Sequence, residues 1–130
     1  MQPILHLSIP VRDLEEARDF YVHTLGCRAA RTRDTFVDVW FYGMQITLQD
    51  RGDEAGLAVN GSRHFGVTLG RGEFDALVSQ LDSAGVHWVV PVSTDDEGRP
   101  TEQTKAKLAD PSGNVIELKT YPDPEAALAR

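Results

Sequence analysis

Apolar and polar residues alternate along most of the chain, which is the pattern of strands that bury one face of a sheet. Two segments show helical spacing instead: one begins at Asp13, a residue type that caps helices, and ends before Gly26, and the other covers 73–84. Polar stretches at 51–62 and 93–100 predict loops. The predicted strands cover residues 4–10, 28–33, 35–42, 44–50, 63–70, 86–92, 103–109 and 114–121. The order strand, helix, three strands therefore occurs twice.

The two halves of the chain also share sequence. HLSIPV at 6–11 matches HFGVTL at 64–69, 58 positions later, and GMQITLQ at 43–49 matches GNVIELK at 113–119, 70 positions later. Preserved order and similar spacing indicate an internal repeat. We therefore expect an α+β fold of two βαβββ modules, residues 1–60 with a linker and residues 61–122, followed by a tail at 123–130. Because strands twist and coil, the modules are expected to form a curved, cup-like mixed sheet with the helices on its outer face.

Strand parity divides the side chains between the two faces of this sheet. The apolar face must lie against the helices, and it would carry Leu5, Leu7, Ile9, Ile46, Leu48, Phe65, Val67, Leu69, Ala106, Leu108, Ile116 and Leu118. The opposite face would carry His6, Ser8, Asp38, Trp40, Tyr42, Gln45, Thr47, Gln49, His64, Thr68, Lys105, Lys107, Glu117, Lys119 and Tyr121. Antiparallel sheets often have one solvated face. A cup lined by imidazoles, carboxylates, aromatic rings and amides is, however, typical of a binding groove.

Composition and charge exclude several classes of function. The chain has 130 residues, with 13 basic and 20 acidic side chains and a formal net charge of −7. This balance argues against a nucleic-acid partner and against an anionic membrane surface. No apolar run approaches the ~20 residues that cross a bilayer, and the N-terminus lacks the pattern of a signal peptide. The single cysteine, Cys27, excludes an intrachain disulfide. We expect a cytoplasmic protein that acts on a small molecule.

Two histidines and one glutamate form a candidate metal site. His6 and His64 occupy equivalent positions in the two repeats, and Glu117 lies on the polar face of the last strand of the second module. Two imidazoles and one carboxylate with open coordination positions are typical of catalytic Fe(II), and the same set can hold Mn, Ni, Co or Zn. A single histidine is more often a structural or surface residue, but the repeat relates this pair. We expect the three side chains to bind a divalent metal ion.

Three segments carry a family resemblance: HLSIPVRDLEEARDFYVHTLG (6–26), RHFGVTL (63–69) and DPSGNVIEL (110–118). Through them the chain resembles the vicinal oxygen chelate superfamily, which includes glyoxalases, extradiol dioxygenases, fosfomycin resistance transferases and bleomycin resistance proteins. The resemblance implies paired βαβββ modules, a homodimer whose metal sites can draw on both chains, and ligands at His6, His64 and Glu117. The fourth, acidic ligand of glyoxalases would fall at Thr47, which cannot act as a general base near neutral pH. This departure argues against lactoylglutathione lyase activity.

Other residues of the polar face are candidate substrate contacts. Thr47 and Tyr121 are the candidate catalytic groups. The Thr47 hydroxyl can bind a substrate oxygen. The resemblance implies a tyrosine near the metal, as in the dioxygenases of that superfamily, and Tyr121 is the candidate, with Tyr42 as the other. Trp40 would form the wall against a ring or alkyl portion, with ordinary packing as the alternative. Lys105, Lys107 and Lys119 would attract an anionic substrate, with a solvated sheet edge as the alternative. The candidate substrate-binding residues are Trp40, Tyr42, Gln49, Lys105 and Lys107.

The candidate site favours a divalent-metal-dependent enzyme of the glyoxalase/dioxygenase type. Its substrate would be a small molecule that chelates the metal through adjacent oxygens, and dioxygenase activity is favoured over lactoylglutathione lyase activity. The alternative is a metal-free, bleomycin-resistance-type protein that sequesters a cationic aromatic compound. The net charge of −7 favours this alternative, whereas the presence of all three metal ligands weighs against it. A degenerate member with a structural or regulatory role is a third hypothesis.

Overall fold

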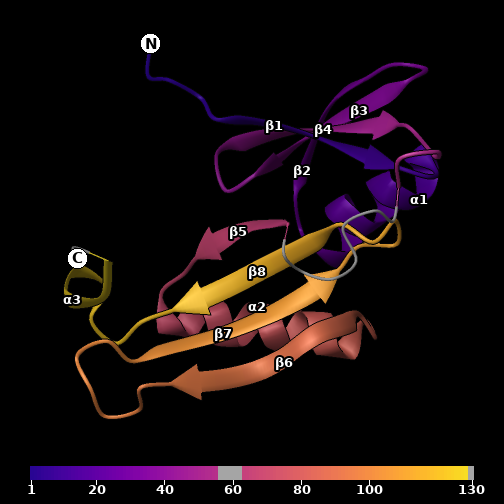
Figure 1. The fold of residues 1–130 in the computed structure, drawn as a ribbon. Helices are drawn as coiled ribbons and strands as arrows, with labels where there is room; N and C mark the ends of the chain where they lie inside the picture. The colour runs from indigo at the N-terminus through magenta and orange to yellow at the C-terminus, as the bar shows by residue number, and fades with distance from the viewer. Residues whose placement is uncertain (56–62, 129–130) are drawn as a thin grey trace. The chain divides into compact units, whose positions relative to one another are not determined.

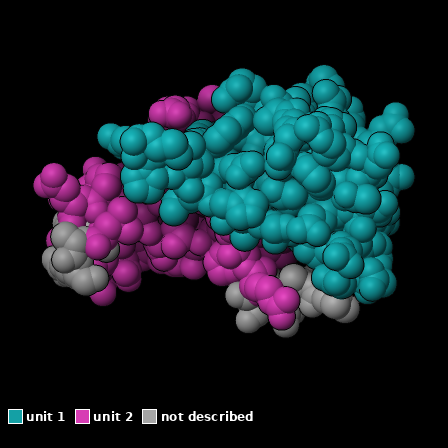
Figure 2. All heavy atoms as spheres, turned by 90° about the horizontal axis from the view of Figure 1, so that it is seen from above, with its two compact units in different colours: residues 1–59, 110–114 teal, residues 60–109, 115–130 magenta. Residues whose placement is uncertain are grey.

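The computed structural model describes residues 1–55 and 63–128. The chain divides into two compact units, which Figure 2 distinguishes by colour. Unit 1 consists of Met1–Val59 together with Asp110–Asn114, and unit 2 consists of Asn60–Ala109 and Val115–Arg130. Unit 1 is therefore built from two stretches of chain that are far apart in the sequence.

The described residues of unit 1 form one helix, a π-helical turn and a four-stranded mixed sheet (Figure 1). The sheet order is β1-β4-β3-β2, and β1 is parallel to β4 while the other pairs are antiparallel. The elements are β1 (His6–Val11), α1 (Leu14–Asp19), the π-helical turn η1 (Phe20–Thr24), β2 (Arg28–Thr32), β3 (Phe36–Phe41) and β4 (Met44–Asp50).

Unit 2 repeats this arrangement with sheet order β5-β8-β7-β6 and a parallel β5–β8 pair. Its elements are β5 (His64–Thr68), α2 (Arg71–Ser83), β6 (His87–Asp95), β7 (Gln103–Ala109) and β8 (Val115–Thr120), followed by the short α3 (Pro124–Leu128). None of the helices in the described residues has the length and apolar character needed to cross a membrane. The α+β fold of two βαβββ modules is confirmed.

Strand register confirms the internal repeat residue by residue. Ser8 of β1 is paired with Thr47 of β4, and Gly66 of β5 is paired with Glu117 of β8. The sequence offset of 58 relates Ser8 to Gly66, and the offset of 70 relates Thr47 to Glu117. The side chain of Thr47 in unit 1 therefore has the same place in its sheet as that of Glu117 in unit 2.

The core of each unit follows the predicted alternation. In unit 1, Ile46 and Leu48 of β4 are fully buried, and in unit 2 Leu108 and Ile116 are fully buried. The prediction for Leu5 is wrong, because this side chain is 73% exposed. The Leu5 carbonyl still accepts the backbone N–H of Gln45 at 2.9 Å, but β1 begins only at His6, so the Leu5 side chain lies at the end of the strand and outside the core.

The first helix forms as predicted at its start and differs at its end. The Asp13 side chain accepts a hydrogen bond from the backbone N–H of Glu16 at 2.8 Å, which satisfies one of the free donors of the first turn. The last turn widens to a π-helical turn, in which the N–H of Leu25 donates to the carbonyl of Phe20 at 2.8 Å. Gly26 then takes φ +86°, the left-handed conformation that ends many helices.

Three other boundaries differ from the prediction for local physical reasons. Helix α2 begins at Arg71 rather than at 73, because Gly70 precedes it without a capping side chain that would mark its start. Strand β6 continues through 93–95, which we predicted as loop, because these polar residues pair with β7. Tyr42 lies in the β3–β4 turn rather than in a strand, with φ +47° beside Gly43 at φ +82°. Positive φ at both turn residues matches the twist of a tight hairpin.

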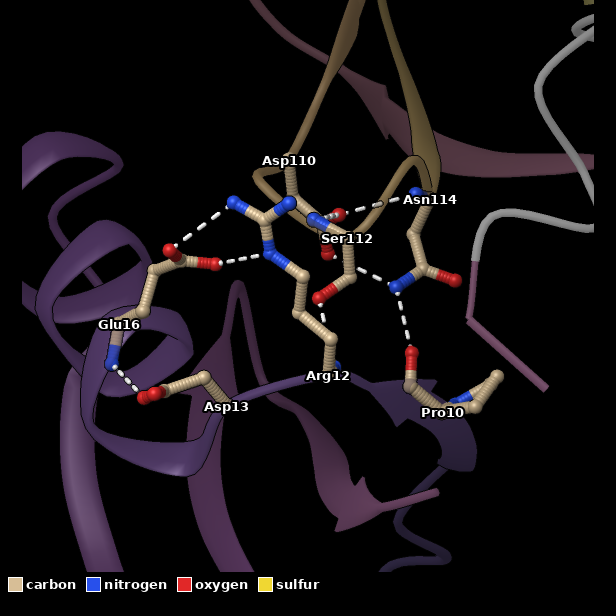
Figure 3. A network of polar contacts seen from close by, with 7 residues as sticks. All are labelled: Pro10, Arg12, Asp13, Glu16, Asp110, Ser112 and Asn114. Atoms are coloured by element: carbon tan, nitrogen blue, oxygen red, sulfur yellow. Dashed lines mark hydrogen bonds and ion pairs between the residues drawn. The ribbon is translucent and has the colours of Figure 1, made fainter. Parts of the chain in front are cut away.

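The turn 110–114 is fixed to β1 by side-chain hydrogen bonds (Figure 3). The backbone N–H of Arg12 donates to Ser112 Oγ at 2.9 Å, and Asn114 Nδ2 donates to the carbonyl oxygen of Pro10 at 2.9 Å. Asp110 organises the turn itself, because its Oδ1 accepts the backbone N–H groups of Ser112 and Asn114 at 2.8 and 2.9 Å. The predicted motif 110–118 therefore begins with a turn that belongs to unit 1.

The carboxylate of Asp110 is buried and also binds the first helical segment. The Tyr21 hydroxyl, which is fully buried, donates to Asp110 Oδ2 at 2.8 Å. Burial raises the pKa of Asp110, although the hydrogen bonds from Asn114 and Tyr21 oppose that rise. Burial and the nearby Asp110 also raise the pKa of Tyr21 well above its usual range. The phenol thus remains a proton donor to this carboxylate over the whole physiological pH range.

Candidate functional site

A hollow of about 290 Å³ lies over the parallel strands β5 and β8 of unit 2. Its polar lining comes from His64, Thr68, Glu117 and Lys119. The parallel pairing of Gly66 with Glu117 and of Thr68 with Lys119 brings these side chains to one face of the sheet. The hollow is thus on the face that strand parity predicted to be polar.

Glu117 is the buried anionic group of this hollow, with only 7% of the residue exposed. Its Oε1 lies 3.7 Å from His64 Nε2 and 3.3 Å from Lys119 Nζ, and its Oε2 lies 3.9 Å from Lys107 Nζ. A buried carboxylate is costly unless charged or hydrogen-bonding neighbours compensate it. Here the compensation comes from two ammonium groups and an imidazole that converge on one carboxylate.

Gly66 sets the distance between the two strands at this point. A Cβ atom at this position would lie 2.7 Å from the carbonyl carbon and 3.0 Å from the Cα of Glu117, and would overlap its carbonyl oxygen. Only glycine permits this approach of β5 to β8. The equivalent residue of unit 1 is Ser8, so the close approach is specific to the strand pair that carries His64 and Glu117.

The same face of unit 1 carries His6, Thr47 and a buried acid. His6 is an exposed residue at the start of β1, in register with Gln45 of β4. The Thr47 hydroxyl donates to Asp38 Oδ1 at 2.7 Å. Since Thr47 donates its proton to a carboxylate, its oxygen lone pairs remain available as acceptors.

Asp38 is a residue that the sequence analysis placed on the polar face without giving it a role. It is only 1% exposed, and its Oδ2 accepts hydrogen bonds from Arg31 Nε and Gln45 Nε2, each at 3.2 Å. The signal in the sequence is a single charge inside the apolar stretch FVDVWF (36–41). A charge at such a position needs partners from neighbouring strands, and Asp38 has them on β2 and β4.

A second hollow, of about 370 Å³, is present in unit 1 beside Trp40 and the β3–β4 turn. The Arg28 guanidinium carbon is 5.6 Å from the centre of the Trp40 ring, within the range of a cation–π contact. Tyr42, also in the lining, is 51% exposed. Cys27 lines the hollow as well, but burial raises the pKa of its thiol to about 12. The thiol is therefore not a nucleophile at neutral pH.

The remaining predicted site residues are held by neighbours within their own units. Gln49 Nε2 donates to the Ser8 hydroxyl in unit 1. In unit 2, Lys105 forms an ion pair with Asp95 at 2.9 Å, and the Tyr121 hydroxyl donates to Gln103 Oε1 at 3.2 Å. The hydrogen bond and charge of Asp95 raise the pKa of Lys105, so its ammonium stays charged beside that carboxylate.

The structure brings together two of the three predicted metal ligands. His64 and Glu117 face each other in unit 2, and His6 belongs to unit 1. Within residues 1–55 and 63–128, no three His, Cys, Asp or Glu side chains form a metal-binding group. Metal–ligand bonds of about 2.0–2.2 Å allow an imidazole nitrogen and a carboxylate oxygen 3.7 Å apart to share one ion after a small adjustment. The donor set of His64 and Glu117 therefore fits a divalent metal.

Comparison with known proteins places this geometry in a family. The family model "Glyoxalase/Bleomycin resistance protein/Dioxygenase superfamily" matches residues 3–118. A structure described as a glyoxalase/bleomycin resistance protein/dioxygenase from Alicyclobacillus acidocaldarius is 36% identical, with a TM-score of 0.87 and 95% coverage of each chain. The fosfomycin resistance protein FosX from Listeria monocytogenes shares the fold at 16% identity and a TM-score of 0.78, with 98% of this chain and 99% of that chain covered. The comparison with curated proteins gave no significant match. From the matched family model and the 36% identical structure, we conclude that the chain belongs to the glyoxalase/bleomycin resistance protein/dioxygenase superfamily.

Proposed function

We propose that this protein is a divalent-metal-dependent enzyme of the glyoxalase/dioxygenase type, with His6, His64 and Glu117 as its metal ligands. The observation that supports the proposal is the buried Glu117 carboxylate, 3.7 Å from His64 Nε2 and at the edge of an open hollow. A carboxylate and an imidazole in this position provide an oxygen and a nitrogen ligand on rigid strands. His6, from the same chain or from a second copy in a homodimer, completes the proposed set.

The substrate proposed for this site is a small molecule that offers two adjacent oxygens. Such a metal supplies Lewis acidity, which favours the build-up of negative charge on a coordinated substrate oxygen. Thr47 would hydrogen-bond the substrate, since its hydroxyl proton is directed to Asp38 and its oxygen can accept. Tyr121 would serve as a second hydrogen-bonding group. Trp40, Tyr42, Gln49, Lys105 and Lys107 are the proposed substrate-binding residues.

A dioxygenase is favoured over a lactoylglutathione lyase because of Thr47. The lyase mechanism needs a carboxylate that moves a proton at this position, and a hydroxyl that donates to Asp38 at 2.7 Å cannot replace it. Metal-free sequestration of a cationic aromatic compound is disfavoured by the charges in both hollows. Arg28 lies over the Trp40 ring, and two lysines surround Glu117, so each hollow already holds its own cation.

Metal binding tests the proposal directly. Purified protein reconstituted with Mn²⁺, Fe²⁺, Ni²⁺, Co²⁺ or Zn²⁺ should hold one ion per chain, measured by elemental analysis and titration calorimetry. Glu117→Gln and His64→Ala should each weaken metal binding by more than the ~10–100-fold that loss of an outer partner costs. His87→Ala, which changes an exposed histidine of the same unit, should leave binding unchanged. Absence of a stoichiometric ion from the wild type would refute the proposed function.

The reaction class is tested on the metal-loaded protein. Oxygen consumption with aromatic vicinal diols should exceed the isomerisation of thiol adducts of 2-oxoaldehydes. Isomerisation without oxygen consumption would contradict the assignment as a dioxygenase and would leave the metal site in place.

A further inference from the structure

We infer that Lys119 is a substrate-binding residue. Its ammonium is paired with Glu117 in the metal-free protein and is released when this carboxylate becomes a metal ligand. The ammonium would then bind a carboxylate group of the substrate, next to the chelating oxygens. This inference rests on the proposed function, because it requires that Glu117 bind a metal. It adds the substrate class: small molecules that carry a carboxylate beside the chelating oxygen.

The inference begins with an excess of positive charge around one buried anion. Lys119 Nζ lies 3.3 Å from Glu117 Oε1, and Lys107 Nζ lies 3.9 Å from Oε2. Glu117 carries one negative charge, so it can neutralise only one of these two ammonium groups. The chain as a whole is acidic, with a net charge of −7, which makes this local excess of positive charge unusual for the protein.

The shared oxygen identifies Lys119 as the group that must move. Oε1 of Glu117 faces both His64 Nε2, at 3.7 Å, and Lys119 Nζ, at 3.3 Å. If His64 and Glu117 hold a divalent cation together, the charge of that cation would repel the Lys119 ammonium beside Oε1. Lys119 can respond because it is a long, flexible side chain, 37% exposed, in the lining of the open hollow.

Neighbouring positions show that this role belongs to Lys119 and not to every lysine of the face. Lys105 is in register with Lys119 on the adjacent strand, but Asp95 pairs with it at 2.9 Å, so its charge is already compensated. The equivalent of Lys119 in unit 1 is Gln49, by the repeat offset of 70, and it is neutral. From the sequence we expect all three lysines to attract an anionic substrate and Lys105 and Lys107 to contact it, and the present inference adds Lys119 as a contact.

The class of ligand follows from the spacing of the two ammonium groups. Lys119 and Lys107 already flank the two oxygens of one carboxylate, Glu117, at 3.3 and 3.9 Å. Their positions therefore suit a second planar carboxylate once the first is engaged. Thr68, in the same lining, offers a hydroxyl donor beside it.

The test uses oxalate, a small carboxylate with adjacent oxygens, and Mn²⁺ as the metal, both followed by titration calorimetry. Lys119→Met retains the stem and removes the charge, and Lys119→Gln copies the residue of unit 1. Both variants should bind Mn²⁺ severalfold more tightly than the wild type, because a competing cation is gone. Loaded with Mn²⁺, both should bind oxalate about tenfold more weakly. Arg99→Met, the control, removes the charge of an exposed arginine of unit 2 that does not line the hollow, and it should stay within twofold of the wild type in both measurements.

A metal-free arm tests the release of the lysine by itself. Glu117→Gln frees the ammonium groups without any metal, so this variant should bind oxalate about tenfold more tightly than the metal-free wild type. Suppose that the wild type binds Mn²⁺ and that the Lys119 variants bind Mn²⁺ and oxalate with the same affinities as the wild type. This result would overturn the inference and leave the proposed function standing. Equal oxalate affinity of metal-free wild type and Glu117→Gln would overturn it as well. A wild type that binds neither Mn²⁺ nor any of the other four divalent ions would overturn both.

Discussion

Replacing Gly66 by alanine tests how closely the backbones of β5 and β8 must approach at the site. The added methyl group would lie 2.7 Å from the carbonyl carbon and 3.0 Å from the Cα of Glu117 and would overlap its carbonyl oxygen. All three are backbone atoms, so no flexible side chain can yield. Overpacking costs ~1–3 kcal/mol, and a backbone clash puts this variant near ~3 kcal/mol. In a chain of this size each kcal/mol lowers the melting temperature by roughly 4 °C, so a fall of about 12 °C is expected.

The assay is thermal unfolding followed by circular dichroism, with Gly72→Ala as the matched control. Nothing lies within 4 Å of a Cβ at Gly72, in the first turn of α2, so alanine there should stabilise by ~0.5–1 kcal/mol. Gly66→Ala should also weaken Mn²⁺ binding, because moving β5 away from β8 separates His64 from Glu117. A Gly66→Ala protein that melts within about 1 °C of the wild type would refute this account of the strand pair.

Two further predictions concern the buried pair of Tyr21 and Asp110. Tyr21→Phe leaves the carboxylate without its phenol donor at 2.8 Å and should destabilise the fold by ~1–3 kcal/mol in urea titrations; an unchanged midpoint would contradict a role for this hydrogen bond. Burial raises the pKa of Asp110, so its contribution to stability is greatest below the unfolded pKa and is lost as the pH rises through the folded pKa. The stability of Asp110→Asn relative to the wild type should therefore increase as the pH rises from about 4, and a difference that is constant with pH would contradict the reasoning.

The sequence repeat predicted more of the fold than propensity did. Matching HLSIPV with HFGVTL and GMQITLQ with GNVIELK gave the order of the elements and the equivalence of Thr47 and Glu117, which the registers confirm. Errors occurred where the alternation continued past the ladder, as at Leu5, or where a turn interrupted it, as at Tyr42. Strand β1 begins at His6, one residue after Leu5, and at Tyr42 the positive φ of the hairpin turn ends the strand.

Site prediction was strongest where a single strand pair determines the geometry. Parity and the repeat together placed His64 and Glu117 on one face, and the structure shows them 3.7 Å apart. The role of Asp38 was missed, because its partners come from two different strands and a pattern along one strand does not reveal them. The ion pair of Lys105 with Asp95 was not foreseen for the same reason, since the two residues lie on different strands. Convergence of His6 with the other two ligands stays a prediction.

The turn 110–114 has a consequence for how the protein is made. Unit 1 includes this turn, whose Ser112 and Asn114 side chains bond to the backbone of Arg12 and Pro10 across about a hundred intervening residues. When the first 59 residues have left the ribosome, the acceptor for the Tyr21 phenol has not yet been synthesised. Unit 1 can therefore reach its final form only after nearly the whole chain has been translated. A gene fragment that ends at the boundary between the repeats would encode a half that lacks Asp110, the buried acceptor of the Tyr21 hydroxyl.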